Sequence, residues 1–393
     1  TLKTGDKSVS VTAADLGISF SNLNVVDEAI DVGRSGNLIK RYKDKKDLQQ
    51  GDKVIALSLD VDSDAVASIL SGKAAQLNQE AVDNGLVREN GAFKIIKGEQ
   101  GIEVNVEDSI AAIENYISSE WDGGNAEIEL VAEVVEPRGS EEDLEQITDM
   151  MGSYTTNYKD SGQNRCDNIS NATSKINGTL LYPGEEFSVY EAIGPLDAAN
   201  GYELAGAYEN GQTVESYGGG VCQVSTTLYN AVILAELEIT QRSNHSMIVS
   251  YVKPSMDAAI AGDYKDLRFV NNQDIPIYIE GYTEGKNVTF KIYGHDTRPS
   301  NRVVTYESEV VSEQDPGTQY VATGDPAGYM KTAQGKHIGY VARLWKVVTV
   351  DGVEESREIF NKSTYKASPK IVNVGTASAD PNVSAVIGAA LAT

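Results

Sequence analysis

The residues with the greatest chemical potential lie in a glycine-rich segment near the middle of the chain, residues 215–230. There Cys222, one of only two cysteines, follows three glycines, Gly218–Gly220, with Val221 between them. Behind it, apolar residues recur with the spacing of one helix face: Val224, Leu228, Ala231 and Ala235. A thiol at a helix N-terminus lies at the positive end of the helix dipole, which lowers its pKa and favours the thiolate. The pattern predicts a cysteine nucleophile at Cys222.

Two other roles for Cys222 stay open on the residues alone. Cysteines are often small buried hydrophobic side chains. Cys166 is also available as a disulfide or redox partner, although two cysteines in 42.2 kDa are too few for a disulfide scaffold. Titration of free thiols would separate a redox pair from two independent thiols.

A cysteine nucleophile needs a base, most often a histidine that a third group orients. The chain has three histidines, and His245 follows Cys222 by enough residues for one helix, a turn and a return to the same helix end. We therefore expect His245 to be the base. Asp257, Asp263 and Asp266 come next, and the sequence does not distinguish which of them orients the imidazole. Our prediction for the third catalytic group is Asp266.

Groups that bind substrate are expected around the same segment. The planar guanidinium of Arg242 matches a carboxylate, although a surface ion pair would explain it equally well. Amides at the helix start could hold an oxyanion, and we expect these from the loop residues Gly219, Gly220 and Val221 and from Cys222 itself. The remaining predicted contacts to substrate are Gln223, Ser246 and Tyr217.

The composition excludes several classes of function. With a net charge of −25 and a pI near 4.5, the chain is not expected to bind nucleic acid or anionic membranes. No apolar stretch approaches the roughly 20 residues that span a bilayer. The spacing of histidines and cysteines indicates no metal site, and no phosphate-binding or dinucleotide motif occurs. We therefore expect no cofactor.

The chain is long enough for two or three domains, and the expected fold class is α+β, multidomain. Residues 1–137 mix strands with amphipathic helices, a mixed α+β N-terminal domain. Residues 138–149 form a linker with a helix start. The central α+β domain covers 150–298 and holds the candidate site. A small all-β domain is expected over 299–376, followed by a flexible tail, 377–393.

The central block also resembles a known family. The motifs that carry the resemblance occur in order: Asn164-Arg165, Asn168-Ile169, Pro183 to Ser188, Gly218 to Asn230, Arg242 with His245-Ser246, and Asp266 to Asn272. Together they are similar to a VanW domain, and the long glycine–cysteine string is highly specific. Residues 1–137 resemble, more loosely, the peptidoglycan-binding domain that precedes such modules. Residues 299–376 resemble the five-glycine (G5) module of bacterial wall proteins.

The resemblance implies an extracytoplasmic bacterial cell-wall protein, located in the wall or at the outer face of the cytoplasmic membrane. It also implies a membrane tether through an N-terminal segment outside the sequence. The VanW family has been associated with glycopeptide resistance and with 3-3 peptidoglycan cross-links, for which the motif cysteine is the nucleophile. That role carries over to Cys222, and the base role to His245. The YkuD type of L,D-transpeptidase places its histidine before the cysteine, so this chain would share at most the mechanism.

The resulting hypothesis is a cysteine L,D-transpeptidase whose partners are peptidoglycan stem peptides and glycan. Water in place of the acceptor amine would make it an L,D-carboxypeptidase. The alternative is a non-catalytic peptidoglycan-binding protein with the same flanking modules. The sequence does not indicate the oligomeric state.

Overall fold

The computed structural model describes residues 1–209, 212–262 and 264–391 and divides into two compact units. The N-terminal unit contains residues 1–84 and 97–138, and the C-terminal unit contains 85–96 and 139–393. Both units mix helices and strands, which confirms the expected α+β multidomain class. Within the described residues, no helix combines the length and the apolar character needed to cross a bilayer.

The N-terminal unit is built on two amphipathic helices, α3 (Ser63–Leu77) and α4 (Val106–Ser119). Each begins after a capping side chain, Asp62 or Asn105, which accepts hydrogen bonds from the first-turn amides. Its other elements are β1 (Leu2–Thr4), β2 (Lys7–Val9), β3 (Ser19–Phe20), α1 (Asn24–Asp31), α2 (Leu38–Gln50), β4 (Leu59–Asp60), β7 (Gly101–Val104), β8 (Ile128–Glu129) and β9 (Ala132–Val135).

The longer segment of the C-terminal unit, 139–393, begins with the short helix α5 (Glu141–Glu145), which Ser140 caps. The unit is centred on a four-stranded antiparallel sheet. The strand order is β10 (Asp149–Asn157), β18 (Asn287–Gly294), β17 (Ile277–Glu284) and β11 (Thr179–Leu181). Two helices, α6 (Gln163–Ile176) and α8 (Val221–Leu234), pack against this sheet. The smaller elements around them are β12 (Glu186–Ser188), α7 (Val189–Ile193), β13 (Leu204–Glu209), β14 (Gln212–Tyr217), β15 (Glu238–Gln241) and β16 (Arg268–Val270).

Helix α8 is buried on all sides, which explains its apolar composition. The polar side chains that it does carry hold the neighbouring chain segment. Thr226 exchanges hydrogen bonds with the backbone of Ala258, and Asn230 donates to the carbonyl of Met256. These bonds fix residues 256–258 across the helix.

The hairpin of β5 (Gly85–Glu89) and β6 (Ala92–Ile96) belongs to the C-terminal unit, although the expected boundary at residue 137 would assign it to the first domain. Phe93 makes edge-to-face contacts with Tyr278 and Tyr293. Arg88 stacks on Tyr293 and forms an ion pair with Glu280 at 3.2 Å. The alternation of apolar and polar residues in this hairpin does not show that its apolar side chains pack into the core of the C-terminal unit.

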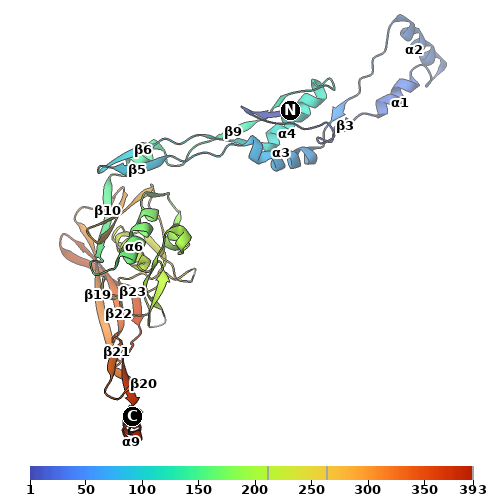
Figure 1. Ribbon diagram of the computed structural model, residues 1–393. Coiled ribbons are helices and arrows are strands. Elements are labelled where there is room, and N and C mark those ends of the chain that lie inside the picture. The colour runs from blue at the N-terminus through green and yellow to red at the C-terminus, as the bar shows by residue number, and fades with distance from the viewer. Residues whose placement is uncertain (210–211, 263, 392–393) are drawn as a thin grey trace. The chain divides into compact units, whose positions relative to one another are not determined.

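The C-terminal β region consists of two three-stranded sheets. Strands β19 (Arg302–Gln314), β22 (Gly339–Val350) and β23 (Val353–Tyr365) form the first, antiparallel sheet. In Figure 1 these long strands lead away from the body of the unit toward the second sheet. The second sheet contains β20 (Thr318–Pro326), β24 (Lys370–Ala377) and β21 (Met330–Gln334).

The first of these sheets packs directly against the central domain. The hydroxyl of Tyr306 donates to the carbonyl of Ile233 at the end of α8, and Leu344 is part of the central core. Glu236 lies between Arg302 and Lys346 of the sheet, whose bonds to it outweigh burial and lower its pKa to about 2. The β region is therefore joined to the central domain by both apolar and ionic contacts.

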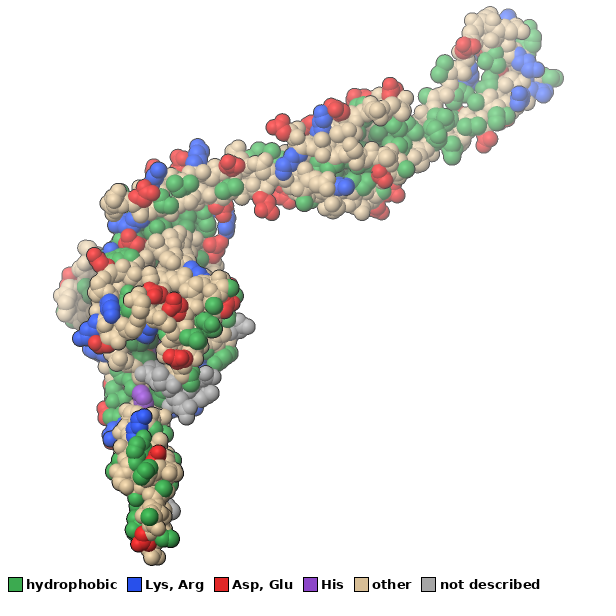
Figure 2. Space-filling model, in the orientation of Figure 1, with side chains coloured by type: hydrophobic (Ala, Val, Ile, Leu, Met, Phe, Trp, Pro, Cys, Tyr) green, Lys and Arg blue, Asp and Glu red, His purple; other side chains and the backbone are tan. Residues whose placement is uncertain are grey.

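The segment expected to be a flexible tail contains helix α9 (Pro381–Leu391). Proline is favoured in the first helical turn because its missing N–H is not needed there. The preceding Asp380 accepts a hydrogen bond from the amide of Asn382, which supports the helix start. Figure 2 shows that acidic side chains are spread over the visible face without forming one patch, as expected for charge that keeps a protein soluble.

Candidate active site

The turn between β14 and α8 places Cys222 at the second position of the helix. Gly218 and Gly220 have φ of 74° and 117°, a backbone region that side chains disfavour. A Cβ on Gly219 would lie 2.6 Å from the carbonyl oxygen of Ala205. The three glycines are therefore required by backbone geometry and by close packing, and they bring a half-buried Cys222 to the helix N-terminus.

His245 lies in the loop after β15 and is held by Asp257. Its Nδ1 and its backbone N–H both bond to Asp257 Oδ2, at 2.7 Å each. Nε2 therefore faces the other way, where it lies 3.4 Å from the hydroxyl of Tyr251, and His245 interacts with the Cys222 thiol closely enough for each group to shift the pKa of the other. The Cys222 sulfur is also 3.5 Å from the amide nitrogen of Ile260. Cys222, His245 and Asp257 thus follow one another in the order that a nucleophile, a base and an orienting carboxylate would need.

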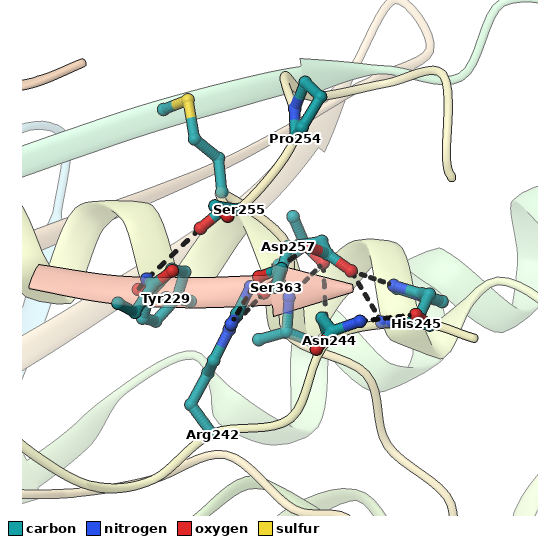
Figure 3. Close-up of polar contacts among 12 residues, drawn as sticks. Tyr229, Arg242, Asn244, His245, Pro254, Ser255, Asp257 and Ser363 are labelled. Carbon is teal, nitrogen blue, oxygen red and sulfur yellow. Dashed lines mark hydrogen bonds and ion pairs between the residues drawn. The ribbon is translucent and has the colours of Figure 1, made fainter. Parts of the chain in front are cut away.

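Asp257 is fully buried and its other oxygen is also occupied. Oδ1 accepts hydrogen bonds from Arg242 Nη2 at 3.1 Å and from the hydroxyl of Tyr365 at 2.5 Å. Figure 3 shows Arg242 and His245 reaching Asp257 from opposite sides, with Ser363 beside the guanidinium. A carboxylate held by this many donors remains ionised and fixed in one orientation.

The charges of the three groups are mutually dependent. Burial raises the pKa of the Cys222 thiol, but the hydrogen bond and charge of His245 and the Ile260 amide bring it below its ordinary value. Burial lowers the pKa of His245, but Asp257 and the Cys222 thiolate raise it to about 9. The pKa of Asp257 is low because His245 and Arg242 outweigh its burial. The lowered pKa of Cys222 and the raised pKa of His245 both favour a thiolate–imidazolium pair over the neutral thiol and imidazole.

The prediction that Asp266 orients His245 is wrong. Asp266 is buried elsewhere, where its carboxylate accepts hydrogen bonds from the Ser188 hydroxyl at 2.6 Å and from the Tyr190 amide at 2.9 Å. It also forms an ion pair with Arg268. Asp266 therefore closes the turn between β12 and α7, and its role is structural. Asp263, the other alternative, lies outside the described residues.

Two residues expected to bind substrate are occupied by the protein itself. Arg242 donates to the carboxylate and carbonyl of Asp257 and to Ser363, so its guanidinium is not free for a ligand. Gln223 is buried and bonds to Arg165 and Thr156. Both were predicted to contact substrate, but their hydrogen-bond partners lie inside the fold.

Some of the predicted oxyanion donors are also occupied by hydrogen bonds within the protein. The amides of Gly219 and Val221 donate to the carbonyls of Ser216 and Gly218 within the turn. The amides of Gly220 and Cys222 have no hydrogen-bond partner in the part of the chain that the structure describes. These two N–H groups, beside the sulfur at the helix N-terminus, are the donors suited to an oxyanion.

The sulfur faces a groove with a volume of about 1820 Å³. Tyr217 and Ser246 line it, as do Tyr251 and the half-exposed Arg165. Tyr251 and Arg165 were not predicted, because neither stands in a spacing that signals chemistry. Both cysteines are free, and Cys166 contacts the carbonyl of Ser161. Among the described residues, no group of three or more His, Cys, Asp or Glu side chains could hold a metal ion.

Comparisons with known proteins agree with this organisation. Residues 164–293 match the family described as "VanW like protein", residues 9–122 the "Putative peptidoglycan binding domain", and residues 305–377 the "G5 domain". The chain is 32% identical to "Uncharacterized protein YoaR" of Bacillus subtilis (strain 168), over 54% of this chain and 69% of that protein. Among solved structures, the IgA1 protease G5 domain is similar over 20% of this chain and 94% of its own, with 29% identity and a TM-score of 0.15.

A second relative is the Vancomycin B-type resistance protein VanW of Enterococcus faecalis (strain ATCC 700802 / V583). It is 30% identical over 28% of this chain, and the match spans 42% of that protein. The cysteine–histidine site lies within the part of the chain that the VanW family model matches. The chain therefore belongs to the VanW family, as a cell-wall protein in which a VanW domain stands between a peptidoglycan-binding domain and a G5 domain.

Proposed function

We propose that the protein is a cysteine L,D-transpeptidase that forms 3-3 cross-links between peptidoglycan stem peptides. The observation that carries the proposal is the Cys222–His245–Asp257 arrangement with its sulfur facing an open groove. An inert buried cysteine would need neither a charged histidine nor a groove. Since stem peptides are exposed outside the cytoplasmic membrane, the proposed activity is extracytoplasmic.

In the first half-reaction, the Cys222 thiolate attacks the carbonyl of the third residue, a diamino acid, of a tetrapeptide stem. The S–C bond forms, and the oxygen of the tetrahedral intermediate is held by the amides of Gly220 and Cys222. His245, which already holds the thiol proton, gives it to the nitrogen of the leaving D-alanine as the C–N bond breaks. The product is a thioester acyl-enzyme.

In the second half-reaction, the side-chain amine of a neighbouring stem peptide attacks the thioester. The neutral His245 accepts a proton from this amine as the new C–N bond forms, and the S–C bond then breaks to restore the thiolate–imidazolium pair. Asp257 keeps Nε2 of the imidazole directed at the sulfur throughout. Water as the acceptor gives the carboxypeptidase reaction.

The charge of the groove supports an anionic peptide as substrate. Its described lining contains four cations and one acidic side chain: Lys159, Arg165, Lys265, Lys366 and Asp160. This excess of positive charge contrasts with a whole-chain net charge of −25. Stem peptides carry several carboxylates, and the volume exceeds the roughly 300–1,000 Å³ of small-molecule pockets. Both properties suit an extended acidic peptide.

The double substitution K265E/K366E tests this assignment of the groove. We expect the KM for a tetrapeptide donor to rise about tenfold with little change in kcat, because each lysine contributes a solvent-screened attraction of under about 1 kcal/mol. Initial rates at several donor and salt concentrations measure it. The control K362E changes an exposed lysine of β23, four residues before Lys366, that does not line the groove. An equal effect in the control would contradict the assignment.

The proposal itself is tested by capturing the acyl-enzyme. Incubation of the protein with purified tetrapeptide muropeptides, followed by denaturation and intact mass measurement, should show an adduct equal to the donor minus D-alanine. Peptide mapping should place the adduct on Cys222, and hydroxylamine should remove it, as expected of a thioester. Binding without an adduct under turnover conditions would favour the second candidate, a non-catalytic wall-binding protein, which the flanking domains also support.

A further inference from the structure

Alternate residues near the end of β23 make polar contacts with the central domain. Side chains two residues apart lie on the same face of a strand, and here that face carries Asn361, Ser363 and Tyr365. Strand β23 belongs to the G5 region, residues 305–377. Each of the three side chains forms a hydrogen bond with a side chain of the central domain. The partners are Tyr229, Arg242 and Asp257, in that order. The contacts therefore link the β module to the triad.

Tyr365 makes the most direct of these contacts. Its hydroxyl donates to Asp257 Oδ1 at 2.5 Å and accepts from the amide of Ser255 at 2.7 Å. The side chain is 2% exposed, so water does not compete for either bond. One hydroxyl thus fixes both the carboxylate and the backbone two residues before it.

Ser363 acts on the same carboxylate through Arg242. Its hydroxyl accepts from Arg242 Nη1 at 2.9 Å, while Nε and Nη2 of the same guanidinium donate to the carbonyl and Oδ1 of Asp257. All three nitrogens of the guanidinium are thereby occupied in one plane. Figure 3 shows Ser363 next to the guanidinium of Arg242.

The strand also holds the strained backbone next to the aspartate. Ser255 has a φ of 67°, a backbone conformation that is unfavourable for a residue with a side chain and persists only where neighbours fix it. Its amide bonds to Tyr365, and its carbonyl accepts from Asn361 Nδ2 at 3.2 Å. Both bonds come from β23.

The loop that carries His245 is held by the end of the same strand. The amide of Lys366 donates to the carbonyl of Ser246 at 2.7 Å, and Asn244 Nδ2 donates to the carbonyl of Thr364 at 3.0 Å. One short segment, residues 361–366, therefore contacts the sequence neighbours of both His245 and Asp257.

We propose that this segment of the G5 module is a positioning element of the active site, in which Tyr365 and Ser363 set the orientation of the Asp257 carboxylate. This inference rests on the proposed function for its catalytic meaning. Neither residue lines the groove, so both act through Asp257 and are positioning residues. It follows that the functional catalytic unit includes β23 and extends beyond the VanW segment, residues 164–293.

The test measures the ionisation of Cys222 without using wall peptide. In a C166S background, the rate of alkylation by iodoacetamide is followed against pH for the full chain and for Y365F and S363A. Loss of either contact loosens Asp257 and weakens the imidazolium opposite the thiolate. We expect the midpoint to move to higher pH and the rate at pH 7 to fall about tenfold for Y365F, and less for S363A.

The matched control is Y340F, because Tyr340 pairs with Tyr365 across the two strands and makes no hydrogen bond through its hydroxyl among the described residues. The charged and titratable groups around the pair are Asp257, Arg242, Tyr251 and Arg165, and all are unchanged in these variants. We expect Y340F to keep the parental midpoint.

An unchanged midpoint in folded Y365F and S363A, as judged by thermal unfolding, would overturn the inference. If Y365F does not fold, S363A decides alone, since it removes a single small acceptor from the buried face of the strand. A wild-type protein that forms no acyl-enzyme would refute the transpeptidase proposal, but the alkylation profile would still report whether β23 positions the triad. The two failures are therefore distinguishable.

Discussion

Replacing Cys222 with alanine should abolish cross-link formation, with a fall in kcat of at least about a thousandfold. The substitution removes the sulfur that is proposed to carry the acyl group, while the hydrogen bonds of His245 to Asp257 remain. Digestion of treated sacculi and mass spectrometry of the muropeptides measure 3-3 dimers directly. Sacculus binding by the same variant should stay near the wild-type level, because the groove and both flanking domains are unaltered.

The matched control is C166A, since Cys166 is the other free thiol and is half-buried like Cys222. Its sulfur makes one weak contact with a backbone carbonyl, at 3.7 Å, and we expect this variant to keep full activity. Unchanged cross-linking in C222A would remove the enzymatic proposal and leave wall binding as the function. Loss of activity in C166A as well as in C222A would point to the redox pair considered from the sequence.

The sequence predicted Cys222 because the signal is local. Three glycines, a thiol and the start of a helical period occupy adjacent positions, and each depends on backbone geometry that the segment itself determines. His245 was also predictable, since the length of helix α8 limits where the chain can return. The class of the fold and the three family matches followed from similarly local patterns.

The third catalytic group could not be predicted, because it depends on how the loop after β15 crosses α8. Thr226 and Asn230 hold residues 256–258 over the helix and so bring Asp257 next to His245. Nothing in the order of the three aspartates encodes this path. The same reasoning applies to Arg242. Its contact with Asp257 depends on the path of the same loop, and its contact with Ser363 joins residues that are far apart along the chain.

The contribution of the β module was equally hidden. Asn361, Ser363 and Tyr365 alternate on one face, as in many exposed strands, and the sequence does not show that this face meets another domain. Only the packing of β23 against the central domain converts an ordinary alternation into contacts with Asp257. Domain boundaries drawn from composition therefore separate residues that act together.

The second large effect on activity is expected from D257N, because Asp257, and not Asp266, is the carboxylate that contacts His245. Asparagine keeps the size of the side chain but removes the charge that opposes the His245 imidazolium, so kcat/KM should fall by about 10³–10⁴-fold. The pKa of His245, about 9 in the wild type, should move down toward its ordinary value. Because the thiolate then loses its counter-ion, the pKa of Cys222 should rise, and the pH range in which both groups are charged should narrow.

D266N provides the matched control, because it makes the same chemical change at the aspartate that sequence reasoning favoured. Asp266 bonds to Ser188 and to the amide of Tyr190, and losing an acceptor there should cost about 1–3 kcal/mol of unfolding free energy. Steady-state rates of the folded fraction should nevertheless equal those of the wild type, with the same pH profile. A pH profile altered in D266N but not in D257N would return the orienting role to Asp266, since only the carboxylate that contacts His245 can change the imidazole pKa by this amount.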